Sequence, residues 1–233
     1  MAIDRAAPAP ARPGGAGAKD LLRLAATEAA VSIAASATTR SRRGPSWLAV
    51  PLLALLAFWT ARLLADPGRG CFLDLVNLAF HEAGHLFLIP FGSTLHYLGG
   101  TLGQLAVPAL LAVYFLLVAP TRPLGAAICA WWVGENLINI SVYMADARDL
   151  ALPLVGGGDH DWNELFYRFG LLGQDSVRAI STGTRGMGGL WMLIGLAWVT
   201  LFALPGGLRE PLIRAAGERA PSFLCLIKGT VED

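Results

Sequence analysis

Five consecutive residues, His81-Glu82-Ala83-Gly84-His85, carry the strongest chemical signal in the sequence. On a helix, two histidines four residues apart lie on one face, one turn apart, so both imidazoles can reach a single metal ion. A glutamate directly after the first histidine is then placed to take a proton from a water molecule at that ion. The spacing therefore predicts a zinc site with His81 and His85 as ligands and Glu82 as the general base.

The segment that contains this run, residues 71–91, is otherwise largely apolar and about long enough to cross the hydrocarbon core of a bilayer. Ionisable side chains at that depth are costly and usually functional. At 100° per residue, Asp74 and Asn77 share a narrow arc with the two histidines, and Glu82 lies at its edge. This polar stripe must face protein or water rather than lipid.

A second polar stripe follows in residues 124–144 and just beyond them. It comprises Glu135, Asn139, Tyr143 and Asp146, with Asn136 at its margin. If both segments run toward the same side of the membrane, the rise per residue puts residues 135–139 at about the depth of the two histidines. We therefore expect a metal site between these segments, with Asn136 or Asn139 donating a hydrogen bond to a developing oxyanion.

A catalytic zinc ion usually takes three protein ligands and a water molecule, so the two histidines need a partner. Three residues are candidates. Asp146 ends the second polar stripe, His160 follows three glycines in a polar segment, and Glu135 has the right depth. The sequence leaves the choice among them open.

The composition predicts an integral membrane protein, because 55% of the 233 residues are hydrophobic and only 15% are charged. The expected surroundings are thus a lipid bilayer. A formal net charge of +1 gives no excess of basic residues for binding nucleic acid. Cys71, Cys129 and Cys225 are far apart in sequence and are expected to pack as small apolar side chains.

The hydropathy pattern predicts an all-α, polytopic membrane bundle with about five transmembrane helices. The expected spans are residues 47–65, 71–91, 104–119, 124–144 and 188–204. They form one domain, residues 47–206, which includes a glycine-rich connection at 92–103 and a long polar loop at 145–186. Residues 1–46 are expected to be a flexible, disordered tail and residues 207–233 a C-terminal tail.

The glycine-rich connection contains His96, for which we expect a structural or interfacial role. Three arginines, Arg40, Arg42 and Arg43, precede the first expected span. They favour an N-terminus in the cytoplasm. The predicted location is the bacterial cytoplasmic membrane, as a multi-pass protein.

In these residues the chain resembles the site-2 protease type of intramembrane zinc metalloprotease. That family has HExxH in one transmembrane helix and an aspartate ligand near the end of a later one, preceded by an asparagine. His81, Glu82 and His85 match the first motif, and Asn136 or Asn139 followed by Asp146 resembles the second without its usual Asn-Pro and Asp-Gly pairs. The resemblance implies a Zn²⁺-dependent peptidase that cleaves membrane or membrane-proximal protein substrates.

Two other classes of function fit the same residues. A non-proteolytic metal-binding membrane protein, a transporter or a sensor, would use the polar stripes as an ion path and would not need Glu82 as a base. A structural helical bundle without metal would use the polar residues only for hydrogen bonds between helices.

Overall fold

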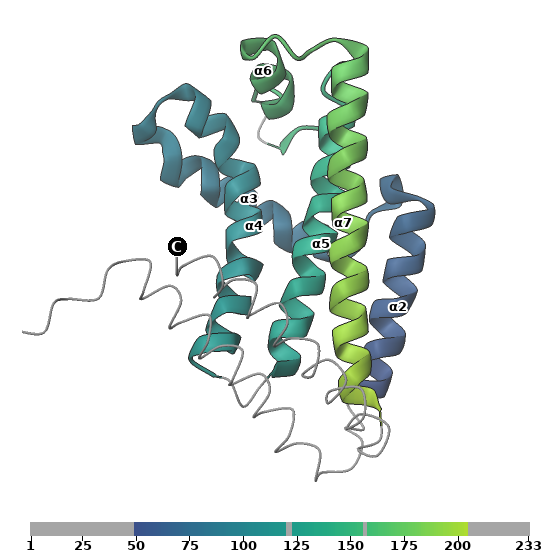
Figure 1. The fold of residues 1–233 in the computed structure, drawn as a ribbon. Coiled ribbons are helices and arrows are strands. Elements are labelled where there is room, and N and C mark those ends of the chain that lie inside the picture. Colours follow the sequence, from purple (N-terminus) through teal and green to yellow (C-terminus); the bar gives the residue numbers. More distant parts are fainter. Residues whose placement is uncertain (1–48, 120–122, 156–157, 205–233) are drawn as a thin grey trace, which may run out of the picture.

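The computed structural model describes residues 49–119, 123–155 and 158–204, and these ranges form helices and turns with no strand (Figure 1). The helices are α2 (Ala49–Ala65), η1 (Pro67–Arg69), α3 (Leu73–Leu88), η2 (Ile89–Phe91), α4 (Ser93–Leu117), α5 (Pro123–Ala145), α6 (Asp161–Arg168) and α7 (Gln174–Ala203). The predicted all-α class is confirmed for this part of the chain. The predicted tails, residues 1–46 and 207–233, lie outside the described residues.

The centre of the fold is the long contact between α5 and α7. Helix α2 packs on α7, while α4 packs on α5, so that α2, α7, α5 and α4 stand side by side (Figure 1). Trp131 of α5, Met192 and Val199 of α7 and Leu63 of α2 are buried in a shared apolar core. The indole nitrogen of Trp131 donates to the hydroxyl of Thr60 at 2.8 Å, which satisfies its polar atom inside that core.

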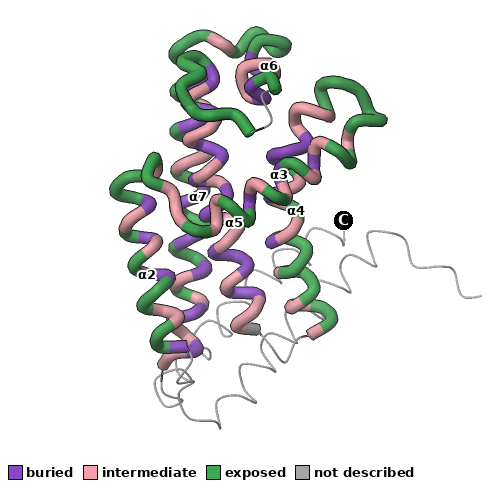
Figure 2. Tube along the Cα trace, turned by 180° about the vertical axis from the view of Figure 1, so that it is seen from behind, coloured by how far each residue is buried: buried purple, intermediate pink, exposed green. Residues whose placement is uncertain are grey.

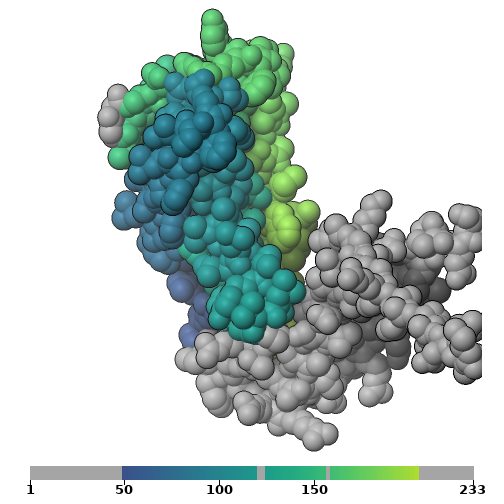
Figure 3. Space-filling view, turned by 90° about the vertical axis from the view of Figure 1, so that its left-hand side faces the viewer, coloured from purple at the N-terminus to yellow at the C-terminus, as the bar shows by residue number. Residues whose placement is uncertain are grey.

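Helix α3 and the first half of α4 form a hairpin on one side of this bundle (Figure 1), and the blue atoms of this part of the chain lie together in the space-filling view (Figure 3). The prediction that residues 92–103 form a connection was wrong, because they are the first turns of α4. Glycine is a poor helix former, but here it allows the two backbones to touch. A Cβ atom on Gly84 would overlap the carbonyl oxygen of Gly99, so neither helix could carry a larger residue at this crossing.

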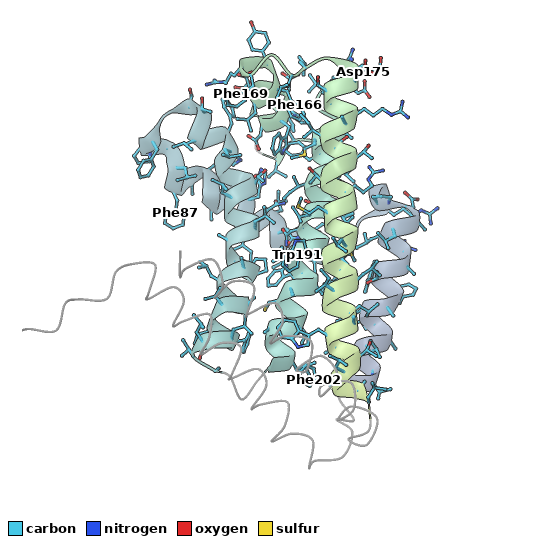
Figure 4. The ribbon with its side chains drawn as sticks, in the orientation of Figure 1. Phe87, Phe166, Phe169, Asp175, Trp191 and Phe202 are labelled. Carbon is cyan, nitrogen blue, oxygen red and sulfur yellow. The ribbon has the colours of Figure 1, made fainter. Side chains whose placement is uncertain are left out.

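The predicted polar loop, residues 145–186, was also wrong beyond residue 160, because this part contains α6 and the first turns of α7. Helix α7 has 30 residues, which corresponds to about 45 Å and exceeds the roughly 30 Å of a bilayer core. Asp175 and Phe202 lie at opposite ends of α7, and α6 lies near the end of α7 that contains Asp175 (Figures 1 and 4).

Two of the described helices, α4 and α7, are long and apolar enough to cross a membrane. Helix α2 is a shorter apolar helix of 17 residues, and α3 has 16, so the five predicted spans are not all matched. Exposed residues run along several helices in Figure 2, and many of them have large apolar side chains. They include Leu55 and Phe58 on α2, Leu110 and Leu117 on α4, and Leu190 and Ile194 on α7.

Candidate metal centre

Three side chains from two distant parts of the chain meet at one end of the bundle. His81 and His85 lie one turn apart on α3, and Asp161 is the first residue of α6. The Nε2 atom of His81 is 2.9 Å from Oδ2 of Asp161, and the Nε2 atom of His85 is 3.2 Å from the same oxygen. Their ligand atoms form a group that could hold a metal ion.

The outer nitrogens of both histidines are bound to carbonyl oxygens. Nδ1 of His85 lies 2.7 Å from the backbone oxygen of His96, and Nδ1 of His81 lies 3.1 Å from Oε1 of Gln104. A carbonyl oxygen only accepts, so each Nδ1 donates its hydrogen, and each Nε2 is the nitrogen that faces Asp161 and could bind a metal ion. Hydrogen bonds of this kind also orient the histidine ligands of metal sites.

The donor set fits a cation. Two imidazole nitrogens and a carboxylate oxygen that face one another attract a positive charge, which can be a proton or a metal ion. The separations of 2.9 and 3.2 Å are close to the edge of about 3.3 Å in a tetrahedron with 2.0–2.1 Å bonds to zinc. Two imidazoles and one carboxylate are a usual ligand set for catalytic zinc, so these residues fit Zn²⁺.

Asp161 was not among the three residues that the sequence offered as the third ligand. Burial raises the pKa of Asp161, but hydrogen bonds from His81 and His85 outweigh that effect and hold the pKa below its ordinary value. Its side chain is therefore a carboxylate at neutral pH and can bind a cation.

His160, one of the predicted ligands, instead holds the start of the helix whose first residue is Asp161. It is the N-cap of α6, and its Nδ1 accepts a hydrogen bond from the backbone N–H of Asn163 at 3.2 Å. Its Nε2 lies 3.4 Å from Oδ2 of Asp146. Burial lowers the pKa of His160 by more than the nearby carboxylates of Asp146 and Asp161 raise it, so the ring is neutral.

Asp146, the second predicted ligand, holds the segment that leads to α6. Its carboxylate accepts hydrogen bonds from the backbone N–H groups of Ala151, at 2.9 Å, and Leu152, at 3.1 Å. Asp146 and His160 thus position the residues around Asp161, and neither belongs to the histidine group.

Glu135, the third predicted ligand, belongs to a second group with Cys71 and Asp74. Its side chain is 1% exposed and accepts from Nδ2 of Asn77 at 2.9 Å and from the thiol of Cys71 at 3.4 Å. Asn139 donates to Oδ1 of Asp74 at 3.1 Å. The two polar stripes do meet, with Glu135 beside Asn77 and Tyr143 beside His81.

The two predicted oxyanion donors are occupied elsewhere. Asn136 is fully buried and donates to the backbone oxygen of Trp132, one turn earlier on its own helix, at 3.1 Å. Asn139 lines the cleft described below, beside Asp74. The structure therefore does not bring Asn136 to the histidine group.

A cleft of about 910 Å³ runs along both groups. Glu82 is exposed and lines this cleft together with His81, His85 and Tyr143. Much of the remaining wall is apolar and includes Leu75, Leu78, Leu86, Ile138, Leu152 and Leu154. Such a wall favours apolar ligands, with a few polar groups fixing their orientation.

Two residues of the site were missed in the sequence, although each left a trace. Asp161 is adjacent to His160, the candidate next to the three glycines, and the helix start lies between them. Gln104 begins the stretch predicted as the third span and is 3% exposed in the structure. A buried amide among apolar residues indicates a hydrogen-bond partner, here His81.

Comparisons of the chain with protein-family models, curated proteins and solved structures found no match.

Replacing Gly100 by alanine tests whether the packing of α4 on α3 positions His81. A Cβ atom at Gly100 would overlap the imidazole of His81, so the ring must shift from its position against Asp161 or α4 must shift from α3. We expect Gly100→Ala to weaken zinc binding by roughly 10- to 100-fold, as is usual when the support of a ligand is lost. Zinc content after equilibrium dialysis measures the effect.

Gly183→Ala is the matched control, because Gly183 lies in α7 and a Cβ atom there would meet nothing within 4 Å. It should bind zinc as the unchanged protein does. Equal zinc binding by both variants would contradict the assigned role of the α3–α4 crossing.

Proposed function

We propose that this protein is a membrane-embedded, zinc-dependent peptidase that cleaves membrane or membrane-proximal polypeptides. The observation that carries the proposal is the convergence of the Nε2 atoms of His81 and His85 on one carboxylate oxygen of Asp161, with Glu82 on the same cleft. The resemblance to site-2 proteases agrees with this proposal for His81, Glu82 and His85. The third ligand would come from the start of α6 instead of Asp146.

The proposed mechanism assigns a task to each residue of the chain. A zinc ion bound by His81, His85 and Asp161 would polarise the scissile carbonyl and acidify the attacking water. Glu82 would take one proton from that water as its oxygen attacks the carbonyl carbon. Glu82 would then pass this proton to the leaving amine nitrogen as the C–N bond breaks.

The location of the site supports a membrane-proximal substrate. The exposed apolar side chains of α2, α4 and α7 suit a lipid environment. Helix α6 and the polar first turns of α7, with Asp175, Arg178 and Arg185, lie at the end of the bundle that also holds Asp161 (Figures 1 and 4). A polypeptide that leaves the bilayer at this end would meet the apolar wall of the cleft first.

A transporter or sensor is the second candidate, and the group of Cys71, Asp74 and Glu135 favours it. These residues line or adjoin the same cleft as the histidine group, so two sets of possible ligands follow one path. In that case Glu82 would have no chemical role, and its replacement would leave function unchanged.

The purified full chain in lipid nanodiscs tests the metal site. We expect about one zinc per chain in the unchanged protein and almost none in His81→Ala, as measured by mass spectrometry of the metal. Leu86→Ala, which changes an exposed residue on the cleft wall, is the control that should keep its zinc. Absence of zinc from unchanged protein purified without chelators would refute the proposal.

Proteolysis is tested without a known substrate by adding the protein to proteoliposomes that contain a total membrane-protein extract. New peptide N-termini should form, disappear with chelator and return with Zn²⁺. Identical N-terminal profiles for the unchanged protein and His81→Ala would contradict a peptidase.

A further inference from the structure

Tyr143 of α5 stands beside the histidine group without belonging to it. Its hydroxyl oxygen accepts a hydrogen bond from the backbone N–H of Asp161 at 3.2 Å, so the hydroxyl lies next to the residue that supplies the carboxylate. Its ring lines the cleft with Glu82, and its centroid is 6.0 Å from that of His81.

The hydrogen of this hydroxyl is free for another partner. A tyrosine O–H both accepts and donates, and the bond from Asp161 uses only an acceptor position. Within the described ranges, no backbone or side-chain atom accepts the hydrogen of Tyr143. A half-buried donor without an acceptor, on the wall of a cleft, is suited to a group that arrives with a ligand.

The ring of Tyr143 is held in place. His160 stacks on it with a centroid distance of 4.1 Å and an interplanar angle of 34°. His160 is itself fixed as the N-cap of α6 and approaches Asp146. His160 and Asp146 therefore fix both Asp161 and Tyr143. A donor fixed in this way needs little reorganisation when it acts.

We propose that Tyr143 is a catalytic residue whose hydroxyl donates a hydrogen bond to the oxyanion that develops on the scissile carbonyl oxygen. This inference rests on the proposed peptidase function. When the water oxygen bonds to the carbonyl carbon, the π electrons move to the carbonyl oxygen, and Tyr143 stabilises that charge without giving up its proton. The electrons return when the C–N bond breaks and Glu82 protonates the amine.

The other side chains considered as hydrogen-bond donors to the oxyanion, Asn136 and Asn139, already donate to other groups of the protein. Asn136 is buried against Trp132, and Asn139 donates to Asp74. His96 lines the cleft and its ring centroid is 5.1 Å from that of His85, so it is a neighbour that could replace Tyr143 in this role. His96→Gln therefore belongs in the same experiment.

The test uses the full chain in nanodiscs with Co²⁺ in place of zinc, because the visible absorption of Co²⁺ reports both its ligands and an added inhibitor. The probe is acetohydroxamate, which presents a carbonyl oxygen and an anionic oxygen to a metal ion. In Tyr143→Phe we expect an unchanged Co²⁺ spectrum without the probe and an affinity for acetohydroxamate that is about 10-fold lower or more, the usual effect of losing a hydrogen bond to a charged group. His96→Gln should stay within about twofold of the unchanged protein, less than the loss of one hydrogen bond.

An affinity of Tyr143→Phe within about twofold of the unchanged protein, or a larger loss in His96→Gln, would overturn the assignment of Tyr143. If Tyr143→Phe does not hold Co²⁺, replacement of Tyr143 by p-aminophenylalanine keeps an acceptor for Asp161 and a weaker donor. Its affinity for the probe should fall several-fold, and an unchanged affinity would equally overturn the assignment.

The same variants separate this inference from the function on which it rests. Failure of the unchanged protein to bind Co²⁺ or zinc refutes the metal site itself. A protein that binds Co²⁺ and cleaves membrane polypeptides, but is indifferent to Tyr143→Phe, refutes only the role of Tyr143. On a substrate identified from the N-terminal profiles, Tyr143→Phe should lower kcat by about 10²- to 10³-fold, the usual effect of removing one oxyanion donor, with little change in KM.

Discussion

Asp161→Ala is expected to remove nearly all zinc from the purified protein, as His81→Ala does. Asp161 provides the one carboxylate oxygen that both histidine Nε2 atoms approach, at 2.9 and 3.2 Å. Without it, two neutral imidazoles remain, and a catalytic zinc site usually needs three protein ligands. The measurement is zinc per chain after dialysis against a weak chelator, compared with the unchanged protein.

Asp159→Ala is the matched control, since this exposed aspartate is only two residues away. Asp159 accepts a hydrogen bond from the hydroxyl of Tyr97 at 2.8 Å and does not contact the histidines. It should leave the zinc content unchanged.

The variants of the two supporting residues complete the comparison. Asp146→Asn and His160→Gln should each keep measurable zinc with an affinity lowered by roughly 10- to 100-fold, because they position Asp161 without binding the ion. If either of them loses zinc completely while Asp161→Ala retains it, the ligand set is wrong.

The helices could be anticipated where hydropathy alone determines them. Residues 49–65 and 123–145 are helical close to the predicted bounds, because an apolar segment in lipid or in a core must satisfy its own backbone groups. The start of α4 could not be anticipated in this way. Gly99 and Gly100 have low helix propensity. Glycine is required there because the backbone of α4 packs directly on Gly84 and His81 of α3, a tertiary contact that local propensity does not include.

The same distinction holds for the site: residues close in sequence could be predicted together, whereas a residue far along the chain could not. His81, Glu82 and His85 lie within one helical turn and a residue, so their shared face follows from the spacing. Asp161 is 80 residues from His81, and its position depends on how the chain returns from α5 to α6. Glu135 was expected at the depth of His81, but its carboxylate instead lies against Asn77, one turn earlier on α3, and Cys71.

Glu82→Gln is expected to abolish peptide cleavage while the zinc content stays at the level of the unchanged protein. Glu82 is exposed, lines the cleft and is not a member of the ligand group, so its loss should not disturb metal binding. The amide is nearly the same size as the carboxylate but cannot take a proton from water. Loss of a general base commonly costs about 10²- to 10⁴-fold in rate, which would appear as a matching fall in kcat.

The same variant decides between the two functional classes, because a transporter needs no proton acceptor at Glu82. We expect Glu82→Gln proteoliposomes to show no new N-termini, whereas a Glu164→Gln control, which changes a glutamate paired with Arg168 on α6, should show the full set. Zinc uptake into the proteoliposomes is measured in parallel. If the unchanged protein never cleaves peptides and zinc uptake persists in Glu82→Gln, the cleft is an ion path. The group of Cys71, Asp74 and Glu135 would then be a second ion-binding site along that path.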